Sequence, residues 1–320
     1  MISKRENILE MLKKNDTISG EKIARQLDIS RTAVWKHIQT LKTKGYNIQS
    51  IKKKGYHLSE IPDKPIQEEI ATQIQTKLIG KHIHYFSCLP STNNYAKTLI
   101  KKNIPEGTII VSDIQTEGRG RKNRTWNSDS GGLWFSIILY PELPPQHGMI
   151  VTMAASIAIA ETIKEITDIH PTIKWPNDVL INGKKICGIL TELDAEIDAI
   201  HYLIVGIGLN VNNTLTESIK QKATTLQKEC NQLVSRVHLL RRILEKFDIL
   251  YQKISQKEYE YMKTNWLNNT DIIGKKLRIH KQTQLIEGTA IGITDTGSLI
   301  LQTDQGEKQI LTGDVEYIND

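Results

Sequence analysis

Residues 118–126 have the sequence Gly-Arg-Gly-Arg-Lys-Asn-Arg-Thr-Trp and directly follow a predicted strand that ends near Gln115. Glycines let a backbone approach a ligand closely, and guanidinium groups can donate paired hydrogen bonds to phosphate or carboxylate. The stretch therefore predicts an anion-binding loop at the end of a strand. A bland basic surface loop, or one that binds nucleic acid, is the alternative that these nine residues leave open.

Around this loop, helices and strands are mixed from about residue 66 to 270, which predicts an α+β domain. Apolar periodicity predicts helices over 149–167 and 236–254. Asn182-Gly183 is a favoured two-residue hairpin turn. The predicted strands are 108–114, 133–140, 179–181, 186–190 and 200–207.

A second informative segment is Lys174-Trp175-Pro176-Asn177-Asp178, followed by a hairpin that carries Lys184, Lys185 and Gly188. Pro176 fixes its own φ and favours extended geometry at Trp175, so the neighbouring polar residues would be held on a stiff strand edge. Such stiffness suits a catalytic lysine. A solvated Lys–Asp pair in a turn is the alternative. A third segment, Gly206-Ile-Gly208-Leu-Asn210-Val211, permits close backbone approach but is a weak signal by itself.

The first 60 residues predict three short amphipathic helices and a hairpin. Apolar residues recur at helical spacing around Ile8, Ile23 and Val34. Ser30 is a good N-cap for the third helix and lies about two residues from the end of the second, as in a helix-turn-helix. Residues 46–51 and 56–58 alternate around Lys52-Lys53-Lys54-Gly55, which predicts the wing of a winged helix.

The outer face of the third helix has the chemistry of a DNA-recognition surface. Cations suit phosphates, and hydroxyl and amide groups suit base edges. Trp35 could equally be half-buried packing. The residues expected to contact DNA are Arg31, Thr32, Trp35, Lys36, Gln39, Lys52, Lys53 and Lys54.

Charge is distributed unevenly along the chain. Residues 1–62 hold 13 Lys and Arg against 6 Asp and Glu, whereas the remainder is nearly balanced. This asymmetry favours a nucleic-acid-binding segment attached to a neutral body. A solvated helical face would explain the charge alone, but not the wing and the helix-turn-helix together.

The 320 residues are enough for two or three domains. Pro62 and Pro65 predict a linker, and short alternating runs after residue 270 predict a small all-β barrel. The expected domains are 1–62, 66–270 and 271–320. The 39% hydrophobic and 24% charged composition is typical of a globular chain and excludes a disordered or collagen-like one.

The sequence shows no export or membrane signal. The apolar stretch 149–163 is interrupted by Thr152 and Ser156 and is shorter than the ~20 residues of a bilayer span, so we expect a buried helix. The N-terminus lacks the apolar core of a signal peptide, and we expect a cytoplasmic protein. The three cysteines lie far apart; we expect each to be a small buried hydrophobe rather than a metal ligand or disulfide partner.

The three segments 118–126, 174–178 and 206–211 occur in this order, with Ser91-Thr92-Asn93 upstream, and together they closely resemble the signatures of the biotin protein ligases. With a winged helix in front, the chain resembles the bifunctional bacterial class that combines ligase and biotin operon repressor. The resemblance covers essentially the whole chain. It implies a multidomain α+β protein with an N-terminal winged helix-turn-helix, a central biotin/lipoate ligase-like catalytic domain and a small C-terminal SH3-like β-barrel.

The resemblance implies a two-step reaction. Biotin and MgATP give biotinyl-5′-AMP and pyrophosphate, and a lysine of a biotin carboxyl carrier protein then takes the biotinyl group, as in acetyl-CoA carboxylase and pyruvate carboxylase. Fixed cations must offset charge on the phosphate oxygens, and no covalent enzyme intermediate is needed. Biotinyl-5′-AMP would also act as corepressor, ordering the arginine loop and promoting a homodimer on operator DNA.

The site residues carried over by motif fall into three groups. Lys174, Arg119, Arg121 and Asp178 would be catalytic, Asp178 by orienting the acceptor lysine. The biotin-binding residues would be Ser91, Thr92, Asn93, Gln115, Gly118, Arg119, Gly120, Arg121, Lys185 and Gly188. The nucleotide-binding residues would be Arg121, Arg124, Trp126 against adenine, Lys174, Asn177 and Asn210. No residue is assigned as a protein ligand of Mg²⁺.

Two departures from the family pattern leave the assignment intact. Asn123 stands where glycine is frequent, and Asn tolerates left-handed backbone geometry; Cys187 stands where a small residue is expected. Two other functions stay open. A pure transcriptional sensor would bind biotin without transferring it, which the lysine and the arginine loop disfavour. A lipoate protein ligase shares the fold and the adenylation chemistry, which the full arginine loop and the winged helix disfavour.

Overall fold

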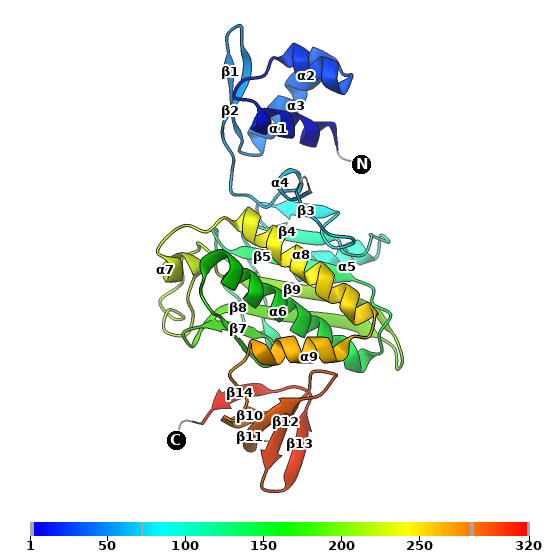
Figure 1. The fold of residues 1–320 in the computed structure, drawn as a ribbon, viewed down its shortest axis with the longest axis vertical. Helices are drawn as coiled ribbons and strands as arrows, with labels where there is room; N and C mark the ends of the chain where they lie inside the picture. The colour runs from blue at the N-terminus through cyan, green and yellow to red at the C-terminus, as the bar shows by residue number, and fades with distance from the viewer. Residues whose placement is uncertain (1–2, 72, 282–284, 319–320) are drawn as a thin grey trace. The chain divides into compact units, whose positions relative to one another are not determined.

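The computed structural model describes residues 3–71, 73–281 and 285–318. The chain divides into two compact units, Met1–Ile74 and Gln75–Asp320 (Figure 1). Each unit is described by itself below.

The first unit is a winged helix. Helices α1 (Lys4–Lys14), α2 (Gly20–Leu27) and α3 (Arg31–Thr43) bury the predicted apolar positions, and β1 (Asn47–Ile51) pairs antiparallel with β2 (Gly55–Glu60). The Ser30 hydroxyl accepts a hydrogen bond from the Ala33 N–H at 3.1 Å, which satisfies one unpaired donor of the α3 N-terminus. The predicted three helices, cap and hairpin are confirmed.

This unit extends beyond the two prolines of the predicted linker. Helix α4 (Gln67–Ala71) buries Ile70 and Glu69. The Tyr46 hydroxyl donates to Glu69 at 2.5 Å, and the Lys13 ammonium lies 2.9 Å from the same carboxylate. The carboxylate side of α4 thus packs on the cationic helices of the winged helix.

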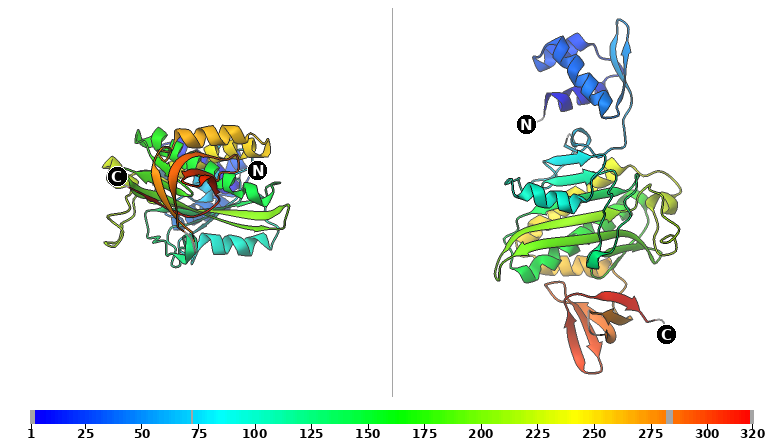
Figure 2. Two further views of the ribbon diagram at one scale, coloured as in Figure 1. Left: turned by 90° about the horizontal axis from the view of Figure 1, so that it is seen from below. Right: turned by 180° about the vertical axis from the view of Figure 1, so that it is seen from behind.

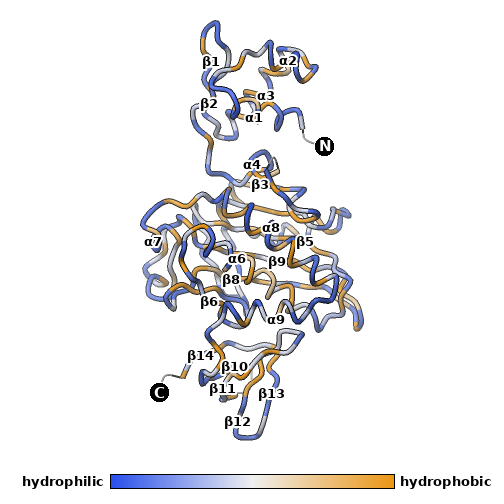
Figure 3. Tube along the Cα trace, viewed as in Figure 1, coloured by the Kyte–Doolittle hydropathy of each residue, from blue (hydrophilic) through white to orange (hydrophobic). Residues whose placement is uncertain are grey.

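A seven-stranded sheet forms the centre of the second unit, in the order β3-β4-β5-β9-β8-β7-β6. Strands β3 and β4 are parallel, and all other neighbours are antiparallel. The strands are β3 (Ile83–Phe86), β4 (Ile109–Ser112), β5 (Leu133–Leu139), β6 (Thr172–Lys174), β7 (Asp178–Ile181), β8 (Lys184–Ala195) and β9 (Ile200–Leu209). Apolar stretches run along the central strands (Figure 3), as burial on both faces requires.

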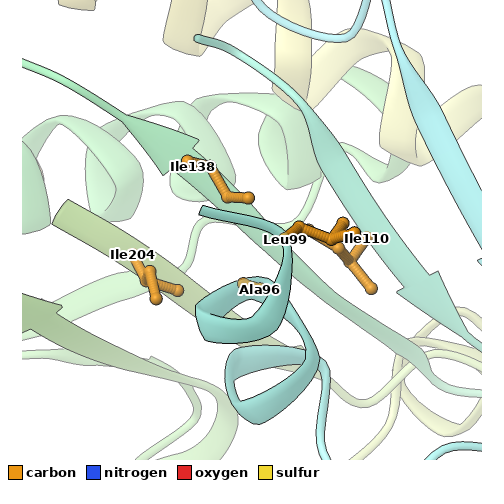
Figure 4. Close-up of a cluster of buried hydrophobic side chains, with 5 residues drawn as sticks. All are labelled: Ala96, Leu99, Ile110, Ile138 and Ile204. Atoms are coloured by element: carbon orange, nitrogen blue, oxygen red, sulfur yellow. The ribbon is translucent and has the colours of Figure 1, made fainter. Parts of the chain in front are cut away.

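Helices cover both faces of this sheet (Figure 2). One face carries α6 (Gly148–Thr167), α8 (Arg236–Ser255) and α9 (Tyr259–Asn268), and the other carries α5 (Thr92–Ile100). Ala96 and Leu99 of α5 pack against Ile110, Ile138 and Ile204 of the sheet (Figure 4). A short helix α7 (Leu226–Cys230) and two 3-10 turns, Arg121–Asn123 and Pro145–His147, complete the α+β layer.

The two long predicted helices and the Asn182-Gly183 turn are confirmed. Both turn residues have positive φ, 51° and 73°, as a type I′ hairpin requires. Strand β8 is longer than predicted and continues past Leu190 to Ala195. Strands β3 and β6 and helices α5 and α9 were not predicted, because each is short or weakly periodic.

The C-terminal segment is all-β, as predicted. Five antiparallel strands have the order β13-β12-β11-β10-β14. They are β10 (Lys276–His280), β11 (Leu285–Ile293), β12 (Leu299–Thr303), β13 (Gly306–Ile310) and β14 (Asp314–Tyr317).

One sequence expectation was wrong. Cys187 is buried, but Cys88 is exposed and Cys230 is half-buried. Cys88 follows β3 in a loop, where no second layer covers it. The helix over 149–163 is buried as expected, and among the described residues no helix has the length and apolarity to cross a membrane.

Candidate active site and nucleic-acid interface

The second unit contains a cavity of about 600 Å³ that is lined by residues of β8 and β9 and of the basic loop. Every residue predicted to bind biotin or nucleotide, or to act in catalysis, lines this cavity except Gly118. Residues more than 100 positions apart in the chain, such as Ser91 and Asn210, therefore meet in one place. A cavity of this size suits a small-molecule ligand.

Gly118 lies at the base of the basic loop instead. A Cβ atom there would stand 2.3 Å from the Trp126 carbonyl oxygen, and the Gly118 carbonyl accepts from the Trp126 N–H at 2.8 Å. The Gly120 N–H likewise donates to the Arg124 carbonyl at 2.7 Å. The loop is thus closed on itself. Asn123 has φ 58°, the left-handed geometry that Asn tolerates.

The glycines of the third segment make room for two site side chains. A Cβ atom on Gly206 would stand 2.2 Å from Asn93 Oδ1, and one on Gly208 would stand 2.4 Å from Trp126 Nε1. Gly188 borders the same indole ring and Lys185. The glycines of this segment, a weak signal in the sequence alone, are therefore required for the packing of these side chains in the site.

A hydrogen-bonded polar cluster lines part of the cavity. The backbone N–H and hydroxyl of Thr92 both lie within hydrogen-bond distance of Gln115 Oε1, at 2.8 and 3.1 Å. Gln115 Nε2 donates to the Ser128 hydroxyl at 2.9 Å. Ser91 caps α5 by accepting from the Asn94 N–H. These are fixed polar groups of the kind that orient a small ligand.

Lysines and an aspartate form a second cluster on the cavity wall. Burial lowers the pKa of Lys174, and the nearby Asp178 carboxylate opposes that shift. Lys185 Nζ lies 2.6 Å from Asp178 Oδ1 and 5.0 Å from the centre of the Trp126 ring. The buried Trp175 indole donates to the Gly297 carbonyl at 3.0 Å, which anchors the Lys174–Asp178 segment.

Two asparagines from the motifs are held in place. Asn177 Nδ2 donates to the Ile189 carbonyl at 2.7 Å, and its Oδ1 accepts from Arg121 at 3.1 Å. Asn210 is buried, and its Oδ1 accepts from Asn213 Nδ2 at 3.2 Å. Both side chains are therefore oriented by the fold.

The C-terminal sheet contributes to this site, which the sequence did not predict. Arg121 donates to the Thr312 hydroxyl at 2.8 Å and to the Gly313 carbonyl at 3.3 Å. Lys122 and Arg124 both pair with Asp314. Burial raises the pKa of Asp314, but hydrogen bonds from Lys122 and Arg124 outweigh this and lower it. About 190 residues separate the partners, so no local pattern could have shown them.

A second surface, on the first unit, has the chemistry of a nucleic-acid interface. Arg31, Thr32 and Trp35 of α3 line a groove together with Lys53 and Lys54 at the hairpin tip. Trp35 lies on the groove wall and is 53% exposed, so it is open to a partner although much of its ring is covered by the protein. Lys36 and Lys52 are exposed outside the groove, and Gln39 is half-buried. Cations and hydrogen-bonding groups thus share one face.

The chain matches three protein families. Residues 4–57 match an HTH domain, residues 85–210 the Biotin/lipoate A/B protein ligase family, and residues 272–317 the Biotin protein ligase C terminal domain. The Bifunctional ligase/repressor BirA of Bacillus subtilis is 39% identical over 318 residues, which cover 98% of each chain. The protein of that name from Escherichia coli is 26% identical over 96% of this chain and 95% of its own.

Solved structures agree. The biotin protein ligase of Aquifex aeolicus in complex with biotin and ATP has a TM-score of 0.66 and 31% identity, and the alignment covers 75% of this chain and all of that one. The chain therefore belongs to the family of bifunctional biotin ligase/repressor proteins. It is a biotin protein ligase that carries an N-terminal helix-turn-helix repressor domain, and the predicted fold class is confirmed.

Proposed function

We propose that the cavity forms biotinyl-5′-AMP from biotin and ATP. In this step the biotin carboxylate attacks the α-phosphate, and pyrophosphate leaves. Arg119, Arg121 and Lys174 are fixed cations on the cavity wall. Preorganised positive charge of this kind stabilises the charge that develops on phosphate oxygens.

The polar cluster around Thr92 and Gln115, together with Lys185, would hold biotin. Hydroxyl, amide and carboxamide groups there can pair with the biotin ring, and the basic loop would close over it. Lys185 would contact the biotin carbonyl region. The residues proposed to bind biotin are Ser91, Thr92, Asn93, Gln115, Gly118, Arg119, Gly120, Arg121, Lys185 and Gly188.

The cations Arg121, Arg124 and Lys174 would hold the nucleotide. The Trp126 ring offers an apolar face on which adenine can stack, as bases do on aromatic side chains. The residues proposed to bind nucleotide are Arg121, Arg124, Trp126, Lys174, Asn177 and Asn210. Catalysis would rest on Lys174, Arg119, Arg121 and Asp178.

The donor set at the cavity fits a Mg²⁺ ion that arrives with ATP. Among the described residues, no group of three His, Cys, Asp or Glu side chains could hold a metal by itself. Mg²⁺ commonly binds through one or two carboxylates together with substrate phosphates, and the cavity offers Asp178 and Asp314. The ion would offset phosphate charge when bound.

The second step would transfer biotin to a lysine of a biotin carboxyl carrier protein domain, such as those of acetyl-CoA carboxylase or pyruvate carboxylase. Asp178 would orient the incoming amine. Its carboxylate already holds an ammonium group, that of Lys185, at 2.6 Å. A second amine could therefore be bound by the same carboxylate.

The winged helix would repress transcription. Arg31, Thr32, Trp35, Lys36, Gln39 and Lys52 to Lys54 would contact operator DNA, with biotinyl-5′-AMP as corepressor and a homodimer placing two winged helices on successive half-sites. The ligand must favour the dimerising state, because equal affinity for both states would shift no equilibrium.

One observation carries the enzyme proposal: the three motif segments and Ser91–Asn93 line a single cavity. The test is ATP-dependent labelling of a carrier domain, with biotin and lipoate as competing substrates. Biotin labelling alone supports the proposal, lipoate labelling would indicate a lipoate ligase, and binding without labelling would indicate a sensor. Analytical ultracentrifugation with biotin, MgATP and operator DNA tests the repressor half; DNA binding indifferent to the adenylate would contradict it.

A further inference from the structure

Glu192 of strand β8 connects two parts of the biotin-binding half without lining the cavity. Its Oε2 accepts a hydrogen bond from Asn93 Nδ2 at 2.8 Å, and its Oε1 lies 3.5 Å from a guanidinium nitrogen of Arg119. Lys97 Nζ lies 2.8 Å from the same Oε1. The residue lies beyond the predicted end of its strand, so the sequence did not indicate it.

The carboxylate fixes the orientation of Asn93. An ionised carboxylate only accepts hydrogen bonds, so the Asn93 amino group must face Glu192 and its Oδ1 must face the other way. That oxygen lies 2.6 Å from the hydroxyl of Ser136 in β5. Asn93 is buried at 4% exposure, and reversing the amide would set its oxygen against the Glu192 carboxylate, acceptor against acceptor.

The orientation is passed on to Thr92. The Ser136 hydroxyl donates toward both Asn93 Oδ1 and the Thr92 hydroxyl, at 2.6 and 2.7 Å. The Thr92 hydroxyl in turn donates to Gln115 Oε1 at 3.1 Å, and both residues line the cavity. Glu192 thus begins a hydrogen-bonded chain that reaches the cavity wall.

Glu192 also restrains the first arginine of the basic loop. Arg119 donates to Asn94 Oδ1 of α5 at 2.5 Å, and Glu192 supplies the facing negative charge from the sheet. Burial raises the pKa of Glu192, but hydrogen bonds from Lys97 and Asn93 lower it overall, so the carboxylate is ionised at neutral pH.

We propose that Glu192 is a positioning residue for the biotin-binding half of the cavity, acting through Asn93 and Arg119. This inference rests on the proposed function. Calorimetric titration of the full chain with biotin, and separately ATP titration, tests it in the variants Glu192→Gln and Lys97→Gln. Lys97 pairs with Glu192 but does not line the cavity, so it is the matched control.

We expect Glu192→Gln to weaken biotin binding by about tenfold, since a buried chain would lose its fixed polarity, with ATP binding and the thermal midpoint unchanged. Lys97→Gln should bind both ligands as the wild type does. If Glu192→Gln fails to fold, Ser136→Ala interrupts the same chain from its other end and should also weaken biotin binding selectively.

Unchanged biotin affinity in Glu192→Gln, or equal losses for biotin and ATP with a lowered thermal midpoint, would overturn the positioning role. Failure of the wild-type chain to bind biotin would instead overturn the proposed function.

Discussion

The indole ring of Trp126 occupies the space that a side chain on Gly208 would need: a Cβ atom there would stand 2.4 Å from Trp126 Nε1. Strand β9 and the basic loop are thereby packed in direct contact at the cavity. A methyl group at this position must displace the ring or the strand.

Gly208→Ala should therefore weaken ATP binding by about tenfold or more, because the proposed adenine platform would move. The measurement is the KM for ATP in adenylate formation. Gly292→Ala is the control, since the nearest atom to its Cβ is 4.0 Å away. Equal effects of the two substitutions would contradict the prediction.

Asp314→Asn should loosen the basic loop. The substitution removes the charge that holds Lys122 and Arg124, so cleavage by trypsin within residues 119–124 should become faster and adenylate formation slower, by roughly three- to tenfold. Exposed Asp304, in the turn between β12 and β13, is the control. Cleavage at the wild-type rate would show that the loop is held by other contacts.

The pH dependence of adenylate formation should reflect the titration of Lys174. Burial lowers its pKa, and the proposed role needs the charged form, so activity should fall with rising pH through a pKa below that of an ordinary lysine. Lys174→Arg keeps its charge at any relevant pH and should shift the alkaline limb upward. An alkaline limb that stays in place in Lys174→Arg would assign it to another group.

DNA affinity should depend on salt through the cations of the wing. Replacing Lys53 and Lys54 by alanine should reduce the slope of log K against log salt by about two, at about 0.9 per phosphate contact. Fluorescence anisotropy at several salt concentrations measures this. A double substitution of the exposed Lys101 and Lys102 of the second unit should leave the slope unchanged, and an equal change in both variants would argue against a wing contact.

Asp248→Asn tests how much the contact between α8 and the first residues of the second unit contributes to stability. The buried Asp248 carboxylate of α8 accepts the backbone N–H groups of Lys77, Leu78 and Ile79 at 2.9 Å each. An amide nitrogen in place of one oxygen would face a backbone donor, so the free energy of unfolding should fall by about 1–3 kcal/mol. Urea denaturation of the full chain measures it, with Asp304→Asn as control.

The sequence predicted those parts of the fold and site that local patterns determine. The α3 cap, the Asn182-Gly183 turn and the apolar helix α6 all depend on neighbouring residues. The order of the sequence motifs indicated which residues share the cavity. Glu192, Ser136 and Asp314 escaped prediction because they act through partners far away in the chain. Helix α5 was missed although Ser91 caps it, since the polar motif residues at its start obscure its apolar stripe.

Three cations of the cavity already have carboxylate partners: Arg119 faces Glu192, Lys185 faces Asp178 and Arg124 faces Asp314. At these three positions, binding an anionic substrate is consequently an exchange of partners rather than a neutralisation of bare charge. Such an exchange releases few counterions to the solvent, unlike DNA binding. The two activities should therefore differ in their sensitivity to ionic strength. A rise in salt that weakens binding to operator DNA should leave the affinity for ATP nearly unchanged.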